Sequence, residues 1–183
     1  MNLRQSLVVA ALANFSSHVW AQGHAHVHGI ATLQVAVEGT ALTLRLVTPL
    51  ENLVGFEHAP RTEQQKKALR EAEESLRGAT ALFVPTAAAR CAASSAKVDS
   101  PFAVKSDAKD RGEKAKPGKE AGEAHSGLTA EYIFRCEQPE RLQGVEVKLF
   151  DRFRGVRRLD VDLAGPRGQK SLRLTPKQRI IAW

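Results

Sequence analysis

The sequence lacks the short motifs that mark common enzyme active sites. It contains no G-x-S-x-G nucleophile turn, no H-E-x-x-H zinc-protease motif and no glycine-rich phosphate loop. No side chain stands out as a general base, so a metal-dependent hydrolase is the least favoured of the functions considered. The sequence therefore predicts that the protein is not an enzyme.

Cysteine is scarce, with only Cys91 and Cys136 in the 183 residues. The two lack a C-x-x-C spacing, so a thiolate metal site is a weaker explanation than a disulfide. In an oxidising compartment an even pair is expected to be bonded. In the chain-entropy model, closing a loop of this length contributes about 4 kcal/mol to the free energy of unfolding.

Long apolar runs are also missing, and the longest, from Leu7 to Phe15, is too short to cross a bilayer. Arg4 precedes it, and Val19 and Ala21 follow at the positions of a cleavage site. This pattern is typical of a signal peptide over residues 1–21. The alternative is a buried N-terminal helix. The pattern predicts an exported, periplasmic protein that begins at Gln22 and is not an integral membrane protein.

Acidic residues are fewer than basic ones, which gives a formal net charge of +7. Much of the excess lies in residues 151–179. No helix-turn-helix pattern and no RNA-binding motif with interleaved aromatic residues accompanies it. We therefore expect solvated strand faces and no nucleic acid partner.

Apolar residues alternate with polar ones on both sides of a turn at Glu38-Gly39-Thr40, which predicts a β-hairpin from Ile30 to Pro49. The segment at residues 50–60 is expected to be irregular. The main helix is predicted at residues 61–79, because Thr62 and Gln65 form a capping-box pattern before a regular apolar stripe. Gly78 is the expected stop.

Further short strands are predicted at residues 81–85, 91–98, 128–136 and 144–150, and a second hairpin at 157–175. Residues 105–124 have no large apolar side chain, so we expect a mobile, disordered charged insertion. No βαβ alternation is present. The fold class predicted is α+β, a single domain over residues 22–183 with an antiparallel β-sheet and one main α-helix.

Three of the six histidines, His24, His26 and His28, alternate within five residues. In an extended chain they lie on one face, about 7 Å apart. Imidazole suits Zn²⁺, Cu²⁺ and Ni²⁺, and a carboxylate or water would complete a zinc shell. The alternative is a solvated polar terminus.

Cleavage after Ala21 would leave Gln22-Gly23-His24 at the N-terminus. Its amine, two deprotonated amides and the imidazole of His24 form a square-planar set that suits Cu²⁺ or Ni²⁺. Conversion of Gln22 to pyroglutamate would abolish this site by consuming the amine.

Further candidate ligands are scattered along the chain: Glu57, His58, His125 and Glu131. A lone loop histidine is more often hydrogen-bonded or exposed than a ligand. Glu131 pairs with His125 only if the fold brings the two together. We expect these residues to bind metal only if the fold brings them close to the N-terminal histidines or to one another.

Five segments together resemble the ZrgA-like family of periplasmic zinc-binding proteins: HAHVHGIATLQVAVEG, LENLVGFEHAP, ALFVPTAAARC, AHSGLTAEYIFRC and LFDRFRGVRRLDVDLAGPRGQ. The resemblance covers essentially the whole chain after the signal peptide. It implies a soluble periplasmic protein that takes part in zinc acquisition beside an ABC-type zinc importer.

Two departures from the family pattern stand out. Family members commonly have a loop rich in histidine and aspartate where this chain has residues 105–124, which contain no histidine. Family members also often have a second histidine where this chain has Thr129. We therefore expect fewer sites and lower capacity, and zinc affinity that falls as imidazoles protonate near a pH of about 6.5.

The sequence supports three functional hypotheses. The first is a monomeric periplasmic zinc-binding accessory protein. The second is a Cu²⁺ or Ni²⁺ chaperone that uses the mature N-terminus. The third is an envelope interaction module whose basic C-terminal strands meet an acidic partner while metal binding is incidental.

Overall fold

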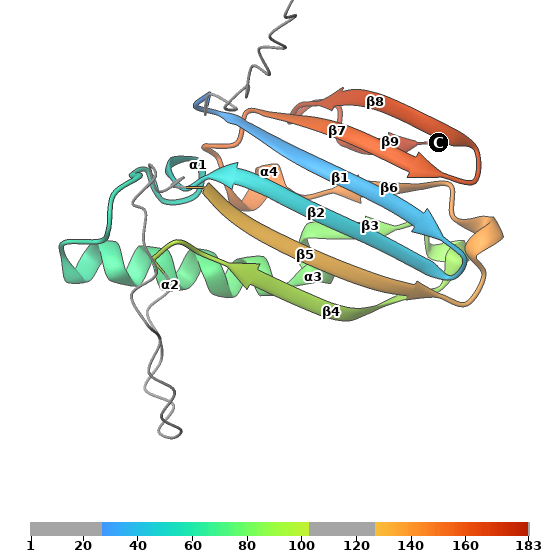
Figure 1. Cartoon of the computed structure of the whole chain (residues 1–183), viewed down its shortest axis with the longest axis horizontal. Coiled ribbons are helices and arrows are strands. Elements are labelled where there is room, and N and C mark those ends of the chain that lie inside the picture. Colours follow the sequence, from blue (N-terminus) through green and yellow to red (C-terminus); the bar gives the residue numbers. More distant parts are fainter. Residues whose placement is uncertain (1–26, 103–126, 183) are drawn as a thin grey trace, which may run out of the picture.

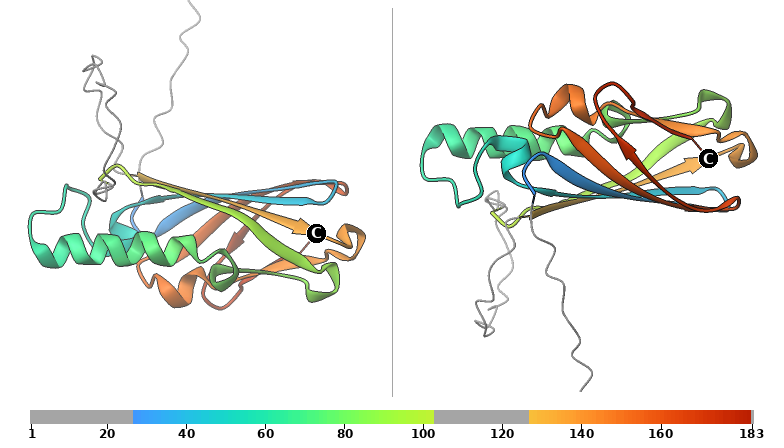
Figure 2. Two further views of the ribbon diagram at one scale, coloured as in Figure 1. Left: turned by 90° about the horizontal axis from the view of Figure 1, so that it is seen from below. Right: turned by 90° about the horizontal axis from the view of Figure 1, so that it is seen from above.

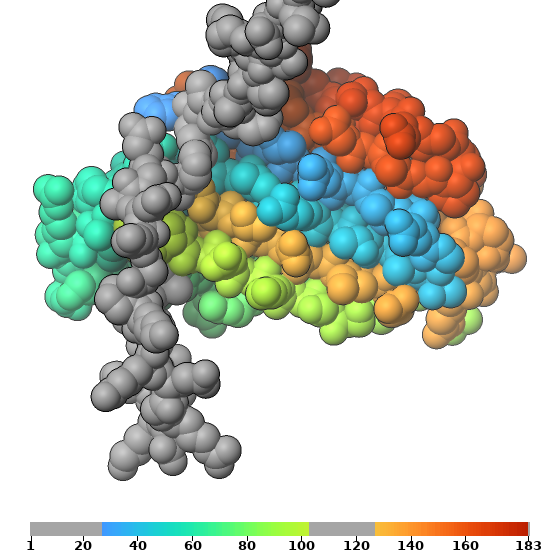
Figure 3. All heavy atoms as spheres, viewed as in Figure 1, coloured from blue at the N-terminus to red at the C-terminus, as the bar shows by residue number. Residues whose placement is uncertain are grey.

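The computed structural model describes residues 27–102 and 127–182. Two β-sheets and a set of helices form two layers (Figure 1). The large sheet has six strands in the order β4-β5-β2-β1-β7-β8, and the small sheet has the order β3-β6-β9. The helices and the small sheet lie on one side of the large sheet (Figure 2), and no other described element covers its opposite face, which is seen in Figure 3.

The strands of the large sheet are β1 (Ile30–Glu38), β2 (Ala41–Pro49), β4 (Cys91–Asp99), β5 (Gly127–Cys136), β7 (Arg158–Gly165) and β8 (Gly168–Leu174). The small sheet contains β3 (Phe83–Pro85), β6 (Gly144–Val147) and β9 (Ile180–Ala182). The helices are α1 (Glu51–Val54), α2 (Glu63–Arg77), α3 (Ala79–Leu82) and α4 (Leu149–Arg152), with 3₁₀ turns at Ala87–Ala89 and Pro139–Arg141.

The predicted hairpin is confirmed as β1–β2. Its two strands pair antiparallel from Glu38↔Ala41 at the turn to Thr32↔Val47 near the open end. Each strand alternates between buried and more exposed side chains, as a sheet with one covered face requires. The apolar side chains of this alternation are all buried: Ala31, Leu33, Val35, Val37, Leu42, Leu44 and Leu46.

The predicted main helix is confirmed as α2. The Thr62 hydroxyl accepts a hydrogen bond from the Gln65 backbone N–H, and the Gln65 side chain accepts one from the Thr62 N–H. This capping box satisfies two N–H groups that have no partner within the helix. Leu69 and Leu76 of the apolar stripe are buried, and Gly78 is the C-cap residue.

The structure contains one strand that the sequence did not predict, β9, and the predicted boundaries differ from it in three further short segments. Residues 51–54 form α1 within the stretch that was expected to be irregular. Residues 79–82 form α3, so β3 begins only at Phe83, and β6 ends at Val147 before α4 begins. Short apolar runs do not distinguish strands from single helical turns, because both bury a few consecutive side chains.

The fold class is α+β with a mainly antiparallel sheet, as predicted. One pair departs from the antiparallel pattern: β1 and β7 run parallel, with Ile30 opposite Arg158 and Ala36 opposite Ala164. The strands are more than one hundred residues apart in the sequence, so no local signal specifies their pairing.

The two cysteines occupy directly opposed positions of β4 and β5 and form a disulfide, as predicted. The Cys136 N–H donates to the Thr40 carbonyl, which places the disulfide near the turn end of the β1–β2 hairpin. The predicted signal peptide at 1–21 and the predicted insertion at 105–124 lie outside the described residues. Within residues 27–102 and 127–182, no helix combines the length and apolar character needed to cross a membrane.

Candidate metal centre

His28 is displayed by a tight turn that leads into β1. The Ile30 N–H donates to the Val27 carbonyl at 3.1 Å, and Gly29 has a φ of 82°. This hydrogen bond and this φ are those of a type II turn with glycine in its third position. The His28 side chain is therefore presented at the corner of the turn, where the imidazole is 65% exposed.

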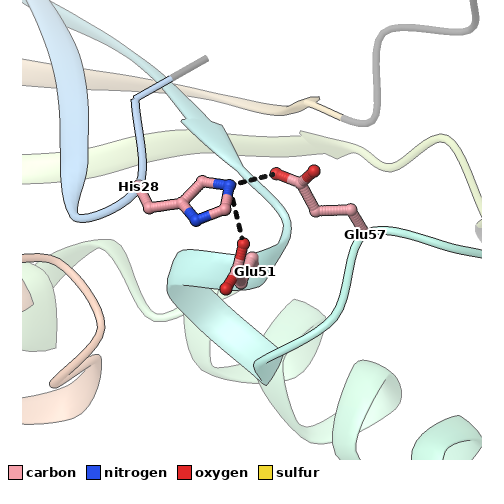
Figure 4. Close-up of side chains that lie close together, drawn as sticks. All are labelled: His28, Glu51 and Glu57. Atoms are coloured by element: carbon pink, nitrogen blue, oxygen red, sulfur yellow. Dashed lines mark ion pairs between the residues drawn. The ribbon is translucent and has the colours of Figure 1, made fainter.

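Two glutamates from the segment after β2 face this imidazole (Figure 4). Glu51 is the first residue of α1, and Glu57 follows α1 in an irregular segment. The α1 turn closes through the Gly55 N–H, which donates to the Glu51 carbonyl at 2.8 Å. The chain thereby reverses within a few residues and directs both carboxylates toward His28.

The three side chains approach to ligand distances. His28 Nε2 lies 3.0 Å from Glu51 Oε2 and 3.9 Å from Glu57 Oε1. One ligand atom from each residue lies within 4.8 Å of the others. Two atoms that each bind a tetrahedral Zn²⁺ at about 2.0–2.1 Å lie about 3.3 Å apart. Small side-chain rotations therefore bring the three atoms onto one ion.

The donor set also suits zinc chemically. Glu57 Oε1 is buried yet has no hydrogen-bond donor among the described residues. A buried carboxylate oxygen without a donor is costly, and a divalent cation would remove this cost. One imidazole and two carboxylates supply the nitrogen and oxygen ligands that Zn²⁺ accepts, with a fourth position left for water or another side chain. Their two negative charges balance the charge of the ion.

The other predicted ligands that the structure describes, His58 and Glu131, are not members of this cluster. His58 stacks on the Phe56 ring, and its Nδ1 lies 2.9 Å from the Ala59 carbonyl oxygen. Glu131 lies on β5, where its carboxylate forms an ion pair with Arg45 at 3.3 Å. His24, His26 and His125 lie outside the described residues. Of the predicted residues, the structure thus brings together His28 and Glu57.

Glu51 was missed by the sequence reasoning, although a signal for it was available. The length of the turn fixes the register of β1 against β2, and the structure closes the hairpin with a two-residue turn at Gly39-Thr40. Extending the pairing Thr32↔Val47 by four residues on each strand places His28 opposite Glu51. A glutamate at that position is the carboxylate partner that the histidines required.

The fold and this site define a class: an α+β protein with a solvent-accessible histidine–carboxylate cluster suited to a divalent cation. Residues 25–183 match the family model described as ZrgA family zinc uptake protein. The match covers most of the chain, so the protein belongs to this family, and the resemblance inferred from the sequence is confirmed. No curated protein sequence gives a significant match.

Proposed function

We propose that this protein is a periplasmic zinc-binding accessory protein that captures Zn²⁺ at the His28–Glu51–Glu57 cluster and works beside an ABC-type zinc importer. The observation that supports this most is the convergence of three ligand atoms within 4.8 Å in a chain that belongs to a zinc uptake family. Zn²⁺ is then the cargo of the protein, bound and released without a chemical reaction.

The exposure of the cluster fits a role in transfer. The His28, Glu51 and Glu57 side chains are 65%, 36% and 34% exposed, so water and an incoming ligand reach the ion. A structural zinc site is usually closed by four protein ligands. A site with three protein ligands releases its ion more readily, because a ligand of the acceptor can enter before a protein ligand leaves.

His24 and His26 are proposed as additional ligands. They precede His28 by four and two residues, so either one is close enough along the chain to fill the fourth position. His58, His125 and Glu131 remain proposed contributors to further, weaker binding. Because the 105–124 segment contains no histidine, we expect the capacity of the protein to be small.

Export is supported by the signal-peptide pattern of residues 1–21 and by the Cys91–Cys136 disulfide, since disulfides persist in oxidising compartments. We propose cleavage after Ala21 and a monomeric mature protein. Intact-mass measurement of protein recovered from the periplasm tests this directly. Recovery of the uncleaved chain from the cytoplasm would contradict it.

Titration calorimetry tests the zinc site. We expect the purified protein to bind Zn²⁺ at neutral pH and His28→Ala and Glu51→Gln each to weaken binding at least about tenfold. Glu137→Gln is the matched control, because it neutralises an exposed glutamate that pairs with Arg90 and directly follows Cys136, near the turn end of the hairpin. Absence of zinc binding, or equal affinities in all four proteins, would overturn the proposal.

A second titration distinguishes the two metal hypotheses. The double variant His24→Ala/His26→Ala retains the described cluster but removes the square-planar site at the mature N-terminus. Zinc binding that persists in the double variant supports the cluster. Preferential binding of Cu²⁺ or Ni²⁺, lost in the double variant, would instead support the chaperone function.

A further inference from the structure

Asn52 is a buried polar residue directly beside the metal cluster. It follows Glu51 in α1 and is only 4% exposed, whereas the two glutamates at the site are much more accessible. An amide that is removed from water is costly unless its donors and acceptor are all bonded. The hydrogen-bond partners of the Asn52 amide therefore identify the segments that this side chain holds together.

The Asn52 side chain bridges α1 and the turn that carries His28. Its Oδ1 accepts a hydrogen bond from the Gly29 N–H at 2.7 Å, and its Nδ2 donates to the Ile30 carbonyl at 2.9 Å. Nδ2 also donates to the Thr48 hydroxyl at the end of β2, at 3.1 Å. One side chain thus holds the two residues that follow His28 against the helix that carries Glu51.

The same turn is also held from the opposite side. The Gly29 carbonyl accepts hydrogen bonds from the Arg157 and Arg158 N–H groups, at 2.8 and 2.9 Å. Both backbone polar groups of Gly29 are therefore bonded, the N–H group to Asn52 and the carbonyl to the start of β7. With Gly29 fixed on both sides, little freedom remains for the peptide that joins it to His28.

We infer that Asn52 is a positioning residue of the zinc site, which sets the separation of His28 and Glu51 before the ion arrives. This inference rests on the proposed function. Residues that do not touch the metal but orient one of its ligands commonly change the metal affinity 10–100-fold when they are removed. Here the orientation acts through the backbone: Asn52 holds Gly29, and Gly29 determines where the neighbouring imidazole lies.

Asn52→Leu tests the inference, since leucine keeps the approximate volume and removes all three hydrogen bonds. Thr48→Val is the matched control. It removes the hydroxyl group that accepts from Asn52 Nδ2 and donates to the Pro49 carbonyl, and it leaves both bonds from Asn52 to the Gly29–Ile30 backbone intact. Zn²⁺ affinity and thermal stability are measured for both variants, and the visible spectrum of bound Co²⁺ reports the ligand geometry.

We expect Asn52→Leu to bind Zn²⁺ about 10–100-fold more weakly than the wild type and to alter the Co²⁺ spectrum. Thr48→Val is expected to lose stability but to keep the wild-type spectrum and an affinity within about twofold, because it does not touch the turn. Wild-type affinity and spectrum in Asn52→Leu would overturn the inference. So would equal weakening in both variants, which would indicate a purely structural role.

Failure of the proposed function has a different signature. If the zinc site does not exist, wild type, His28→Ala and Glu51→Gln behave alike. If the site exists but Asn52 does not position it, Glu51→Gln weakens binding while Asn52→Leu does not. The two failures are therefore separated by variants measured in one series.

Hydrogen exchange supplies a test that needs no variant. If Asn52 fixes the turn before zinc binds, the Gly29 amide is protected from exchange in the zinc-free protein. The Val27 amide provides an internal comparison, since Val27 is exposed. Rapid exchange of Gly29 without zinc, followed by protection when zinc is added, would overturn the inference, because the ion would then order the turn.

Discussion

His28 and Glu51 face each other across the open end of the β1–β2 hairpin, with Nε2 3.0 Å from Oε2. His28 lies four residues before Thr32 and Glu51 four residues after Val47, which are paired residues of the two strands. The two residues lie just beyond the last paired residues of the hairpin, where His28 lies in the turn before β1 and Glu51 begins α1. Asn52 joins these two segments through its hydrogen bonds to Gly29 and Ile30.

Glu57→Gln should separate zinc binding from stability. Two carboxylates face one imidazole at the cluster, so loss of one charge relieves repulsion in the zinc-free protein and removes a ligand from the zinc-bound protein. We expect the zinc-free free energy of unfolding to be unchanged or higher. Zinc affinity should fall at least about tenfold, which corresponds to about 1.4 kcal/mol. Thermal unfolding with and without Zn²⁺ measures both. A parallel loss of stability in both conditions would contradict the assignment of Glu57 as a ligand.

Gly29→Ala should disturb the site through the backbone. Gly29 has a φ of 82°, a conformation that costs a residue with a Cβ about 1–2 kcal/mol. Gly39→Ala is the matched control, because Gly39 also has a positive φ, of 55°, but lies at the other end of the hairpin. Both variants should lose stability in denaturant unfolding. Only Gly29→Ala should weaken Zn²⁺ binding in calorimetry, and equal affinities would show that the turn does not set the position of His28.

Removal of the disulfide should destabilise the protein without changing the zinc site. Cys91 and Cys136 are separated by 45 residues, so their cross-link is expected to contribute about 4 kcal/mol to the free energy of unfolding. The disulfide lies near the turn end of the hairpin, and the metal cluster lies at the open end. We expect the Cys91→Ala/Cys136→Ala variant to unfold at a lower denaturant concentration and, while folded, to bind Zn²⁺ with wild-type affinity. A large change in affinity would show that the two ends are coupled.

Tyr132 should cause a loss of stability in alkali. Burial raises the pKa of its hydroxyl group well above the ordinary value of 10.0, and this hydroxyl has no hydrogen-bond partner among the described residues. The unfolded chain releases the proton near pH 10, whereas the folded protein retains it. The contribution of Tyr132 to stability is therefore complete below about pH 10 and is lost as the pH rises above that value.

Tyr132→Phe should unfold with a weaker pH dependence above pH 10. Tyr132 is the only tyrosine of the chain, so the ultraviolet absorption of its phenolate reports its ionisation without interference. We expect this absorption to appear together with unfolding. Ionisation in the folded protein near the ordinary pKa would contradict the burial argument. Below pH 10 the substitution should leave stability unchanged or raise it slightly, because it removes a buried hydroxyl group without a partner.

The sequence identified the elements whose pattern is local. Alternation with a period of two revealed the β1–β2 and β7–β8 hairpins, and the capping box with its apolar stripe revealed α2. These signals are readable because each element must bury one face of its own side chains. The resemblance between the five quoted segments and the ZrgA-like family also came from the sequence. His28 and Glu57 were among the candidate ligands for the same reason, since their residue types are visible without a fold.

The tertiary structure alone decided which candidates meet. Beside the parallel pairing of β1 with β7, the Gly29 carbonyl accepts hydrogen bonds from Arg157 and Arg158. No local sequence pattern in either strand predicts this pairing. Likewise, Glu131 is a candidate ligand by residue type, and the strand register places it opposite Arg45, with which its carboxylate forms an ion pair. A ligand set depends on distances of a few ångströms between segments far apart in the chain. Only packing fixes such distances, and here it holds Gly29 between Asn52 and the residues at the start of β7.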